Sequence, residues 1–283
     1  MVERVQSGVV VGAIDVGAPR NIGWAILSDG SEATGQDLDA FIDTFARLAN
    51  DRPAALGFEA PLFIPVGRPT GKLTTQREGE NGRPWSAGAG AAVTTLGLAV
   101  VTQVLDHLRT KLPNKRARLD WQDWPYLDDL LIFEAFVSGA NHAGPGEHHL
   151  DALNAAKAFH ESLGDLDAAN AVVEENVLSL AGACMARTGW ATTNADLLSE
   201  PCLVIRPGSD FQNARPVKKE HPVPKNICIC GCGGETKGGK FLPGHDQTLR
   251  MAIEKAAGGL ESLRAIMENH LGHSIEAQPK THR

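Results

Sequence analysis

The feature that most constrains the fold of this chain is a short apolar run at residues 9–15, VVVGAID, which ends in an aspartate. Its β-branched residues, followed by Gly17 and Pro19, predict a buried strand that enters a turn. An acidic side chain at the end of a buried run is costly unless it is paired or binds a metal ion. Asp15 therefore marks both the first strand of a sheet and a candidate site.

The hydrophobic pattern after Asp15 predicts a mixed α/β domain. Apolar runs flank the hairpin-type turn Asp29-Gly30, and a helically spaced segment precedes another buried strand. In chain order we expect strands at 21–27 and 31–34, a helix at 37–50, a strand at 54–58, a long loop at 61–89, a helix at 91–112, a strand at 129–136, helices at 150–163 and 167–187, and a strand at 201–207. This order predicts a mixed sheet flanked by helices over residues 8–207.

Four acidic side chains occupy comparable places in this pattern. Asp15 and Glu59 end strands, Glu134 lies within the strand at 129–136, and Asp151 begins a helix. Ligand sites in α/β sheets form at the carboxyl ends of strands, and Mg²⁺ and Mn²⁺ prefer oxygen ligands. Each acid alone is explained more simply as a solvated strand end or a helix cap. Together they predict a site for a pair of hard cations.

Three basic side chains are candidate helpers of this site. His148 precedes Asp151 by about one helical turn, where it could shuttle a proton or bind metal; an exposed histidine at a helix start is the alternative. Arg68 and Arg77 follow Glu59 in the long loop and could contact substrate phosphates. A mobile, solvated loop is the alternative for both arginines.

Four short motifs in order give the chain a family resemblance. VVGAIDVGAPRNIGWAIL resembles the opening hairpin of ribonuclease-H-like nucleases. GFEAPLFIPVGRP with QREGENGRPWSAG, IFEAFVS and HHLDALNAAKAF resemble successive motifs of the predicted nuclease family called domain-of-unknown-function family 429, over about residues 9–165. The resemblance implies a ribonuclease-H-like fold in which Asp15, Glu59, Glu134 and Asp151 hold metal for phosphodiester hydrolysis. Glu59 stands where the family more often has Asp, so its carboxyl group reaches further.

Three of the five cysteines fall within five positions near the C-terminus. Cys228, Cys230 and Cys232 alternate with single residues, and His245 follows. Three thiolates and one imidazole form a closed tetrahedral set for structural Zn²⁺. An odd count with one tight cluster suits metal binding better than a disulfide framework. Redox sensing and a thiol cluster without metal are the alternatives.

Charge and hydropathy limit the expected partners. The net charge of -7 argues against a constitutive nucleic-acid coat protein but not against a nuclease. The chain around the cysteines is locally basic, so we expect a linker at 208–226 and, at 227–270, a zinc module that faces nucleic acid and includes a helix near residues 247–269. A soluble linker competes with this interpretation. We see no secretory segment and no membrane-spanning apolar run, and we expect a cytoplasmic protein. The sequence indicates no oligomeric state.

Three classes of function fit these patterns. The first is a metal-dependent nuclease, a hydrolase using Mg²⁺ or Mn²⁺, with Zn²⁺ as a structural ion. The second is a phosphotransferase or ATPase of the actin-like superfamily, whose chains also open with a glycine-flanked aspartate on a hairpin. Its phosphate loops usually carry Ser or Thr hydroxyls, which the turn DVGAPRNIG lacks. The third is a non-catalytic binding protein with structural acids. The sequence favours the nuclease.

Overall fold

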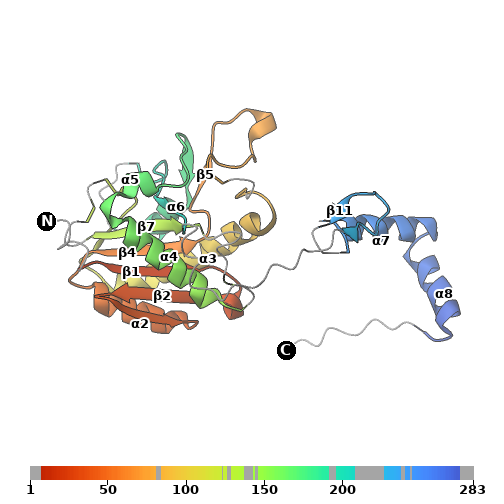
Figure 1. Ribbon diagram of the computed structural model, residues 1–283, viewed down its shortest axis with the longest axis horizontal. Coiled ribbons are helices and arrows are strands. Elements are labelled where there is room, and N and C mark those ends of the chain that lie inside the picture. Colours follow the sequence, from red (N-terminus) through yellow and green to blue (C-terminus); the bar gives the residue numbers. More distant parts are fainter. Residues whose placement is uncertain are drawn as a thin grey trace. The chain divides into compact units, whose positions relative to one another are not determined.

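The chain forms two compact units in its computed structural model, residues 1–214 and residues 215–283 (Figure 1). Each unit has its own secondary structure. The structure describes residues 8–80, 84–122, 124–125, 129–136, 143, 146–190, 196–207, 226–236, 240–242 and 244–274.

A seven-stranded mixed sheet forms the centre of the first unit. Its strands are β1 (Val10–Asp15), β2 (Gly23–Ser28), β3 (Ser31–Gly35), β4 (Ala54–Glu59), β6 (Arg116–Arg118), β7 (Asp129–Ala135) and β9 (Val204–Ile205). The order is β3-β2-β1-β4-β7-β6, and β9 also pairs with β7. The first three strands are antiparallel neighbours, whereas β1, β4, β7, β6 and β9 pair in parallel. The predicted mixed α/β sheet is confirmed.

Helices cover both faces of this sheet (Figure 1). The helices and the remaining short elements of the first unit are α2 (Leu38–Ala49), α3 (Gly88–Lys111), α4 (His148–Glu161), α5 (Leu166–Ala169), α6 (Leu180–Arg187), the 3-10 turns η1 (Pro19–Asn21), η2 (Thr70–Lys72) and η4 (Ser162–Gly164), and the ladder of β5 (Phe63–Pro65) with β8 (Val177–Ser179). Helices α2, α3 and α6 contribute to the core on one face, and α4 covers the other.

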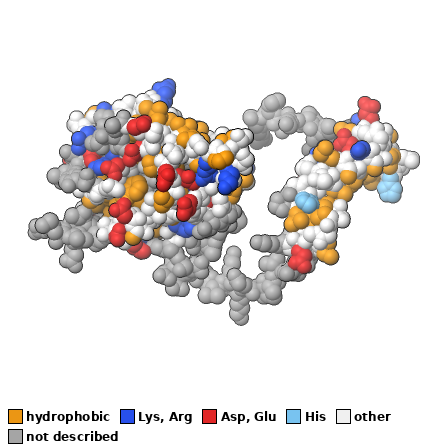
Figure 2. All heavy atoms as spheres, turned by 90° about the horizontal axis from the view of Figure 1, so that it is seen from above, with side chains coloured by type: hydrophobic (Ala, Val, Ile, Leu, Met, Phe, Trp, Pro, Cys, Tyr) orange, Lys and Arg blue, Asp and Glu red, His pale blue; other side chains and the backbone are white. Residues whose placement is uncertain are grey.

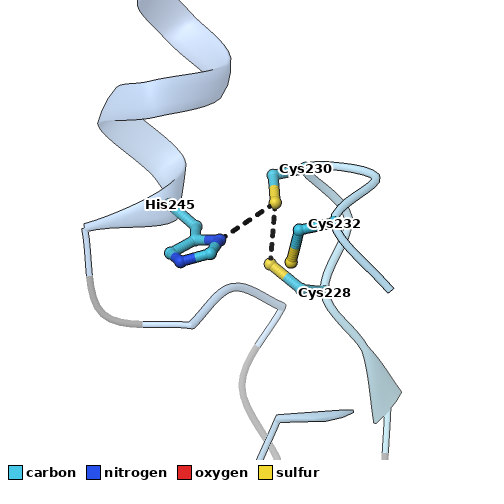
Figure 3. A group of neighbouring side chains, drawn as sticks. All are labelled: Cys228, Cys230, Cys232 and His245. Atoms are coloured by element: carbon cyan, nitrogen blue, oxygen red, sulfur yellow. Dashed lines mark hydrogen bonds between the residues drawn. The ribbon is translucent and has the colours of Figure 1, made fainter. Parts of the chain in front are cut away.

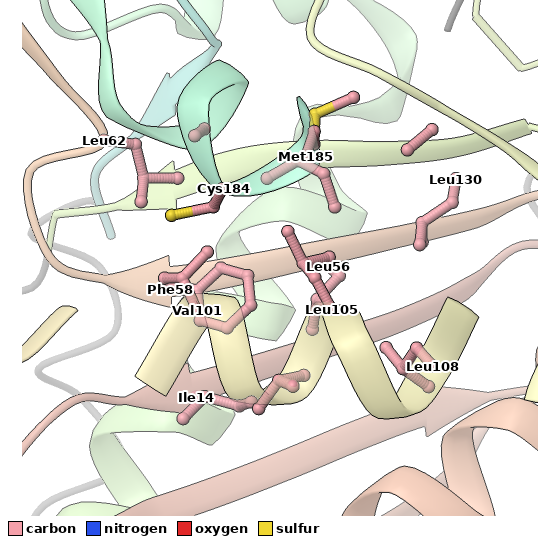
Figure 4. Close-up of a cluster of buried hydrophobic side chains, with 14 of the residues drawn as sticks. Ile14, Leu56, Phe58, Leu62, Val101, Leu105, Leu108, Leu130, Cys184 and Met185 are labelled. Carbon is pink, nitrogen blue, oxygen red and sulfur yellow. The ribbon is translucent and has the colours of Figure 1, made fainter. Parts of the chain in front are cut away.

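Strand alternation divides the apolar side chains between two cores. In β1, Val10 and Ile14 join the core beneath α2, α3 and α6, whereas Val11 and Ala13 join the core beneath α4. Figure 4 shows the first core, where Ile14 and its neighbours on β4 and β7 lie against α3 and α6. The same alternation decides to which face the acid at each strand end points.

By length and composition, α3 is the helix of the described chain that could cross a membrane. Five of its residues are buried, and Val101, Val104, Leu105 and Leu108 belong to the core beneath the sheet. Packing of this kind is the environment of a core helix. The apolar stretch therefore has a structural role inside the first unit.

The helix predicted at residues 167–187 is helical at both ends but interrupted between them. Helix α5 ends at Ala169, and β8 then pairs antiparallel with β5, with Ser179 opposite Phe63. The side chain of Ser179 accepts a hydrogen bond from the Gly182 amide and caps α6, where the helix resumes. Pairing with a distant segment has overridden the local helical pattern.

The second unit contains a hairpin followed by two helices. Its elements are β10 (Asn226–Ile227), β11 (Glu235–Thr236), α7 (His245–Ala256) and α8 (Leu260–Leu271). The single helix predicted near residues 247–269 is two, because Gly258 and Gly259 adopt φ values of 85° and 110° between them. Hydrophobic side chains lie along the surface of this unit (Figure 2), and neither helix buries a residue.

Candidate functional site

Three of the four predicted acids converge at the carboxyl ends of β1 and β4. Asp15 and Glu59 are register partners on these adjacent parallel strands, so their side chains point to the same face of the sheet. That face is covered by α4, whose first turn carries Asp151 with 0% exposure. The expected grouping of Asp15, Glu59 and Asp151 is thus present in the structure.

A glycine on β2 lets the start of α4 approach these acids. Gly23 is the register partner of Asp15, and a Cβ added to Gly23 would lie 2.2 Å from the backbone carbon of His148. Behind this contact, Ala152, Ala155 and Ala156 are buried against the sheet. Small residues at the contact therefore set the distance between α4 and the strand that carries Asp15.

Burial and the two neighbouring acids disfavour the charged form of Glu59. Burial raises the pKa of Glu59 well above its usual value, and the charges of Asp15 and Asp151 raise it further. Glu59 also hydrogen-bonds to Asp15, while its Oε2 atom is buried without a hydrogen-bond partner. Asp151 Oδ1 accepts a hydrogen bond of 2.5 Å from the Ala143 amide. A cation would relieve both the repulsion and the unsatisfied oxygen.

His148 binds the acid at the end of β1. Its Nδ1 atom lies 2.6 Å from Asp15 Oδ2. Burial raises the pKa of Asp15, and the hydrogen bond and charge of His148 partly oppose that effect. The sequence placed His148 beside Asp151, but its resolved side-chain partner is Asp15, so the acid fixes the orientation of the ring.

Glu134 does not join the other acids, which corrects the expectation of four ligands in one cluster. Its register partner on β4 is Phe58, the residue before Glu59, so alternation sends its side chain to the opposite face. There Glu134 Oε1 lies 2.6 Å from Arg77 Nη2, and Oε2 accepts hydrogen bonds from Arg77 Nη1 at 2.8 Å and the Leu62 amide at 2.9 Å. Both oxygens are therefore engaged by the protein.

Neither predicted phosphate-binding arginine is free to serve that role. Arg77 is 0% exposed and, besides Glu134, its Nε atom lies 2.8 Å from Glu80 Oε1. Burial lowers the pKa of Arg77, but Glu134 and Glu80 raise it above its usual value, so Arg77 is a permanent cation. Arg68 pairs with Glu174 and donates to the Thr75 carbonyl at 2.8 Å. These contacts also disagree with the alternative of a solvated loop for both arginines.

Glu80 is the member of this buried network that sequence reasoning missed. Its carboxylate accepts hydrogen bonds from the Arg77 amide at 2.8 Å and from the Trp85 amide at 3.1 Å. The available signal was the three-residue spacing between Arg77 and Glu80, which favours a local ion pair. The network is why the chain after Glu59 is packed onto the sheet.

A second candidate site lies in the second unit. One ligand atom from each of Cys228, Cys230, Cys232 and His245 falls within 4.8 Å of the others (Figure 3). Cys230 Sγ lies 3.1 Å from His245 Nδ1 and 3.3 Å from Cys228 Sγ. The cysteines follow β10 in the hairpin, and His245 begins α7. The predicted Cys₃His group is confirmed as a candidate metal site.

Backbone amides support thiolate charge in this group. The Leu242 amide donates to Cys228 Sγ at 3.3 Å, and the Gly234 amide donates to Cys232 Sγ at 3.4 Å. Burial raises the pKa of Cys228, but hydrogen bonds from the amides of Leu242 and Cys230 and from the thiols of Cys230 and Cys232 lower it overall. The pKa of Cys230 is raised to about 11 by burial and by its contact with Cys228. Thiolate is the form of cysteine that binds metal.

The Cys₃His group is more compact than the acid group. Among the described residues, it is the set of candidate ligands whose atoms all lie within 4.8 Å of one another, so the carboxyl groups of Asp15, Glu59 and Asp151 are less tightly gathered.

No family model, curated protein or solved structure matches the chain.

Proposed function

We propose that the first unit is a metal-dependent nuclease that hydrolyses phosphodiester bonds in nucleic acid, with Asp15, Glu59 and Asp151 as its metal ligands. The observation that carries this proposal is the buried, unpartnered Oε2 atom of Glu59 beside two further carboxyl groups. Carboxylates suit Mg²⁺ or Mn²⁺. When bound, such cations supply an activated water and relieve negative charge on the reacting phosphate.

The protein's own residues divide the remaining work. Asp15 is 7% exposed and is the ligand that can meet solvent or substrate. The Ala143 amide donates a hydrogen bond to Asp151 and orients its carboxyl group. His148 is fixed through Nδ1 by Asp15, so Nε2 is the ring atom that can exchange a proton with solvent or substrate. Glu59 has a longer side chain than Asp15 and Asp151, so its carboxyl group reaches further from the strand. Each of these roles is part of the proposal.

The sheet supports the family resemblance that motivates the activity. An antiparallel meander of β1, β2 and β3 is followed by parallel β4 and β7, and α4 then brings an Asp-Ala-Leu sequence onto the sheet. This arrangement agrees with a ribonuclease-H-like fold closed by an aspartate-bearing helix. The proposal now rests on three acids, since Glu134 serves the opposite face.

The cleavage test uses the purified full chain with labelled single-stranded, duplex and branched DNA and RNA, with Mg²⁺ or Mn²⁺. We expect cleavage that needs the metal and falls at least about 100-fold in Asp15→Asn, the scale on which loss of a central catalytic group acts. Asp39→Asn is the matched control, because the side chain of Asp39 is 88% exposed on α2. Cleavage unchanged in Asp15→Asn, or absent with every substrate, would overturn the proposal.

For the second unit we propose a structural Zn²⁺ held by Cys228, Cys230, Cys232 and His245. Four protein ligands fill a tetrahedral site, which leaves no position for substrate. A direct role of this unit in nucleic-acid binding has less support. Its described residues include four Lys and Arg side chains and five Asp and Glu side chains. Of the linker expected at 208–226, residues 208–225 lie outside the described residues.

Metal analysis tests the zinc site. We expect one zinc per chain in the purified protein, lost in Cys230→Ser and in His245→Ala. Cys184→Ser is the matched control, because Cys184 is buried on α6 of the first unit. Protein without zinc, or zinc unchanged in both ligand variants, would remove the site.

A further inference from the structure

The strand end that carries Glu59 is anchored from the opposite face of the sheet. β4 ends at Glu59, and the Ala60 amide bonds locally to the Phe58 carbonyl at 2.9 Å. The Leu62 amide is bonded from the opposite face, donating to Glu134 Oε2 at 2.9 Å. Arg77 Nη1 donates to the Phe63 carbonyl at 3.2 Å. The Leu62 carbonyl accepts hydrogen bonds from the amides of Leu180 and Ala181 at 2.8 and 2.9 Å. The peptide just after Glu59 is thus held at several points.

The chain after Glu59 is held by a buried network of hydrogen-bonded ion pairs among Arg77, Glu80 and Glu134. Arg77 bonds both oxygens of Glu134, and its Nε atom bonds Glu80, with each of the three side chains no more than 1% exposed. Apolar residues of similar volume often stabilise a fold as well as a buried ion pair does. Stability alone therefore does not explain an Arg77–Glu134 pair. Its hydrogen bonds to the chain at Leu62 and Phe63 give it a second role.

We propose that Arg77 and Glu134 are positioning residues for Glu59, an inference that rests on the proposed metal-binding function. The hydrogen bonds to the Leu62 amide and the Phe63 carbonyl restrain the chain three and four residues after Glu59. This restraint limits movement of the end of β4 and keeps the Glu59 carboxyl group in place. Glu134 on one face of the sheet therefore positions Glu59 on the other face.

Arg77→Lys tests this role without removing a metal ligand, because a cationic side chain does not bind Mn²⁺. Lysine keeps the charge but cannot bond both Glu134 oxygens and Glu80 in the fork geometry of arginine. We expect the Kd for Mn²⁺, measured by electron paramagnetic resonance on the full chain, to rise about tenfold, the lower end of the effect of losing a residue that orients a ligand. Far-UV circular dichroism should match that of the wild type.

Arg118→Lys is the matched control. Arg118 is a buried arginine of the same sheet, bonded to Asp129 and Asp120 at 3.1 Å, and Asp129 stands at the opposite end of β7 from Glu134. Its replacement should leave the Kd for Mn²⁺ unchanged. If Arg118→Lys weakens Mn²⁺ as much as Arg77→Lys does, the effect is general destabilisation and the positioning role is wrong.

A second variant keeps the test decisive if Arg77→Lys does not fold. Arg77→Met with Glu134→Leu and Glu80→Gln replaces the charged network by uncharged side chains, leaves no buried carboxylate without its cation, and removes both hydrogen bonds to the chain after Glu59. We expect a folded protein with weakened Mn²⁺ binding. Wild-type Kd in either folded variant overturns the positioning role, whereas a wild-type chain that binds no Mn²⁺ overturns the proposed function on which it rests.

Discussion

At the carboxyl ends of the parallel strands, acidic side chains on the two faces of the sheet have different partners. On one face, Glu134 and Glu80 share the guanidinium group of Arg77, and their oxygens are hydrogen-bonded. On the other face, Asp15 and Glu59 meet Asp151, and an oxygen of Glu59 is buried without a partner. The chain thus neutralises acids that hold structure and leaves a gathered set whose charge a cation would balance. The following predictions test that contrast.

The largest effect is expected where the neutralised acid is removed. Glu134→Ala leaves Arg77 buried with Glu80 as its remaining anion, so we expect the free energy of unfolding to fall by about 3–5 kcal/mol in urea denaturation. Asp29→Ala removes the anion of the partly exposed Arg52–Asp29 pair and should cost at most about 1 kcal/mol. Equal losses in the two variants would contradict a special stabilising role of the buried network.

Metal should stabilise the group formed by Asp15, Glu59 and Asp151. A cation that binds only the folded chain adds about 2.7 kcal/mol when its concentration is 100 times the Kd. We expect this gain in wild-type denaturation curves measured with Mn²⁺, and no gain in Asp151→Asn. Glu134→Gln should keep much of the gain because Glu134 is not a ligand. A gain that survives Asp151→Asn would place the ion elsewhere.

The approach of α4 is the next element to test. Gly23→Ala forces a methyl group against the backbone of His148, so we expect a loss of about 1–3 kcal/mol in stability together with weaker Mn²⁺ binding. Gly12→Ala is the control, because its methyl group would meet the Phe45 ring, 2.8 Å from an added Cβ, on the other face. Gly12→Ala should lose stability alone, and a shared loss of Mn²⁺ binding would count against α4 as the cause.

The smallest effect is expected for Glu59 without metal. Glu59→Gln removes a carboxyl group that burial and two neighbouring acids disfavour in its charged form. We expect the metal-free protein to be unchanged or up to about 1 kcal/mol more stable, as is common for residues kept for function. Mn²⁺ binding should be lost at the same time. A clear loss of metal-free stability would show that Glu59 is structural.

Sequence reasoning located the strands of the site because their apolar runs are buried on both faces. Residues 9–15, 54–58 and 129–136 nearly coincide with β1, β4 and β7. Their shared edge then predicted that Asp15 and Glu59 meet. The side to which Glu134 points depends on the register between β4 and β7, and a shift of one residue reverses it. No local pattern in the sequence fixes that register.

Two further features depended on contacts between distant segments. The pairing of β8 with β5 interrupts a stretch whose composition favours a helix. The burial of Arg77 follows from its ion pair with Glu134, on a strand far along the chain. The local sequence, rich in glycine and proline, predicts an exposed phosphate contact instead. The Cys₃His group was found from the sequence because its cysteines are neighbours and only His245 had to be added.

The most direct test of the central claim is a crystal of the chain soaked in Mn²⁺ and measured at a wavelength where manganese scatters anomalously. The account predicts an anomalous peak on the face beneath α4, bound by oxygens of Asp15, Glu59 and Asp151 at about 2.1 Å, as for a small divalent cation. The peak should be absent in crystals of Asp15→Asn. A peak at Glu134 on the opposite face, or no peak near Asp15 at saturating Mn²⁺, would contradict it.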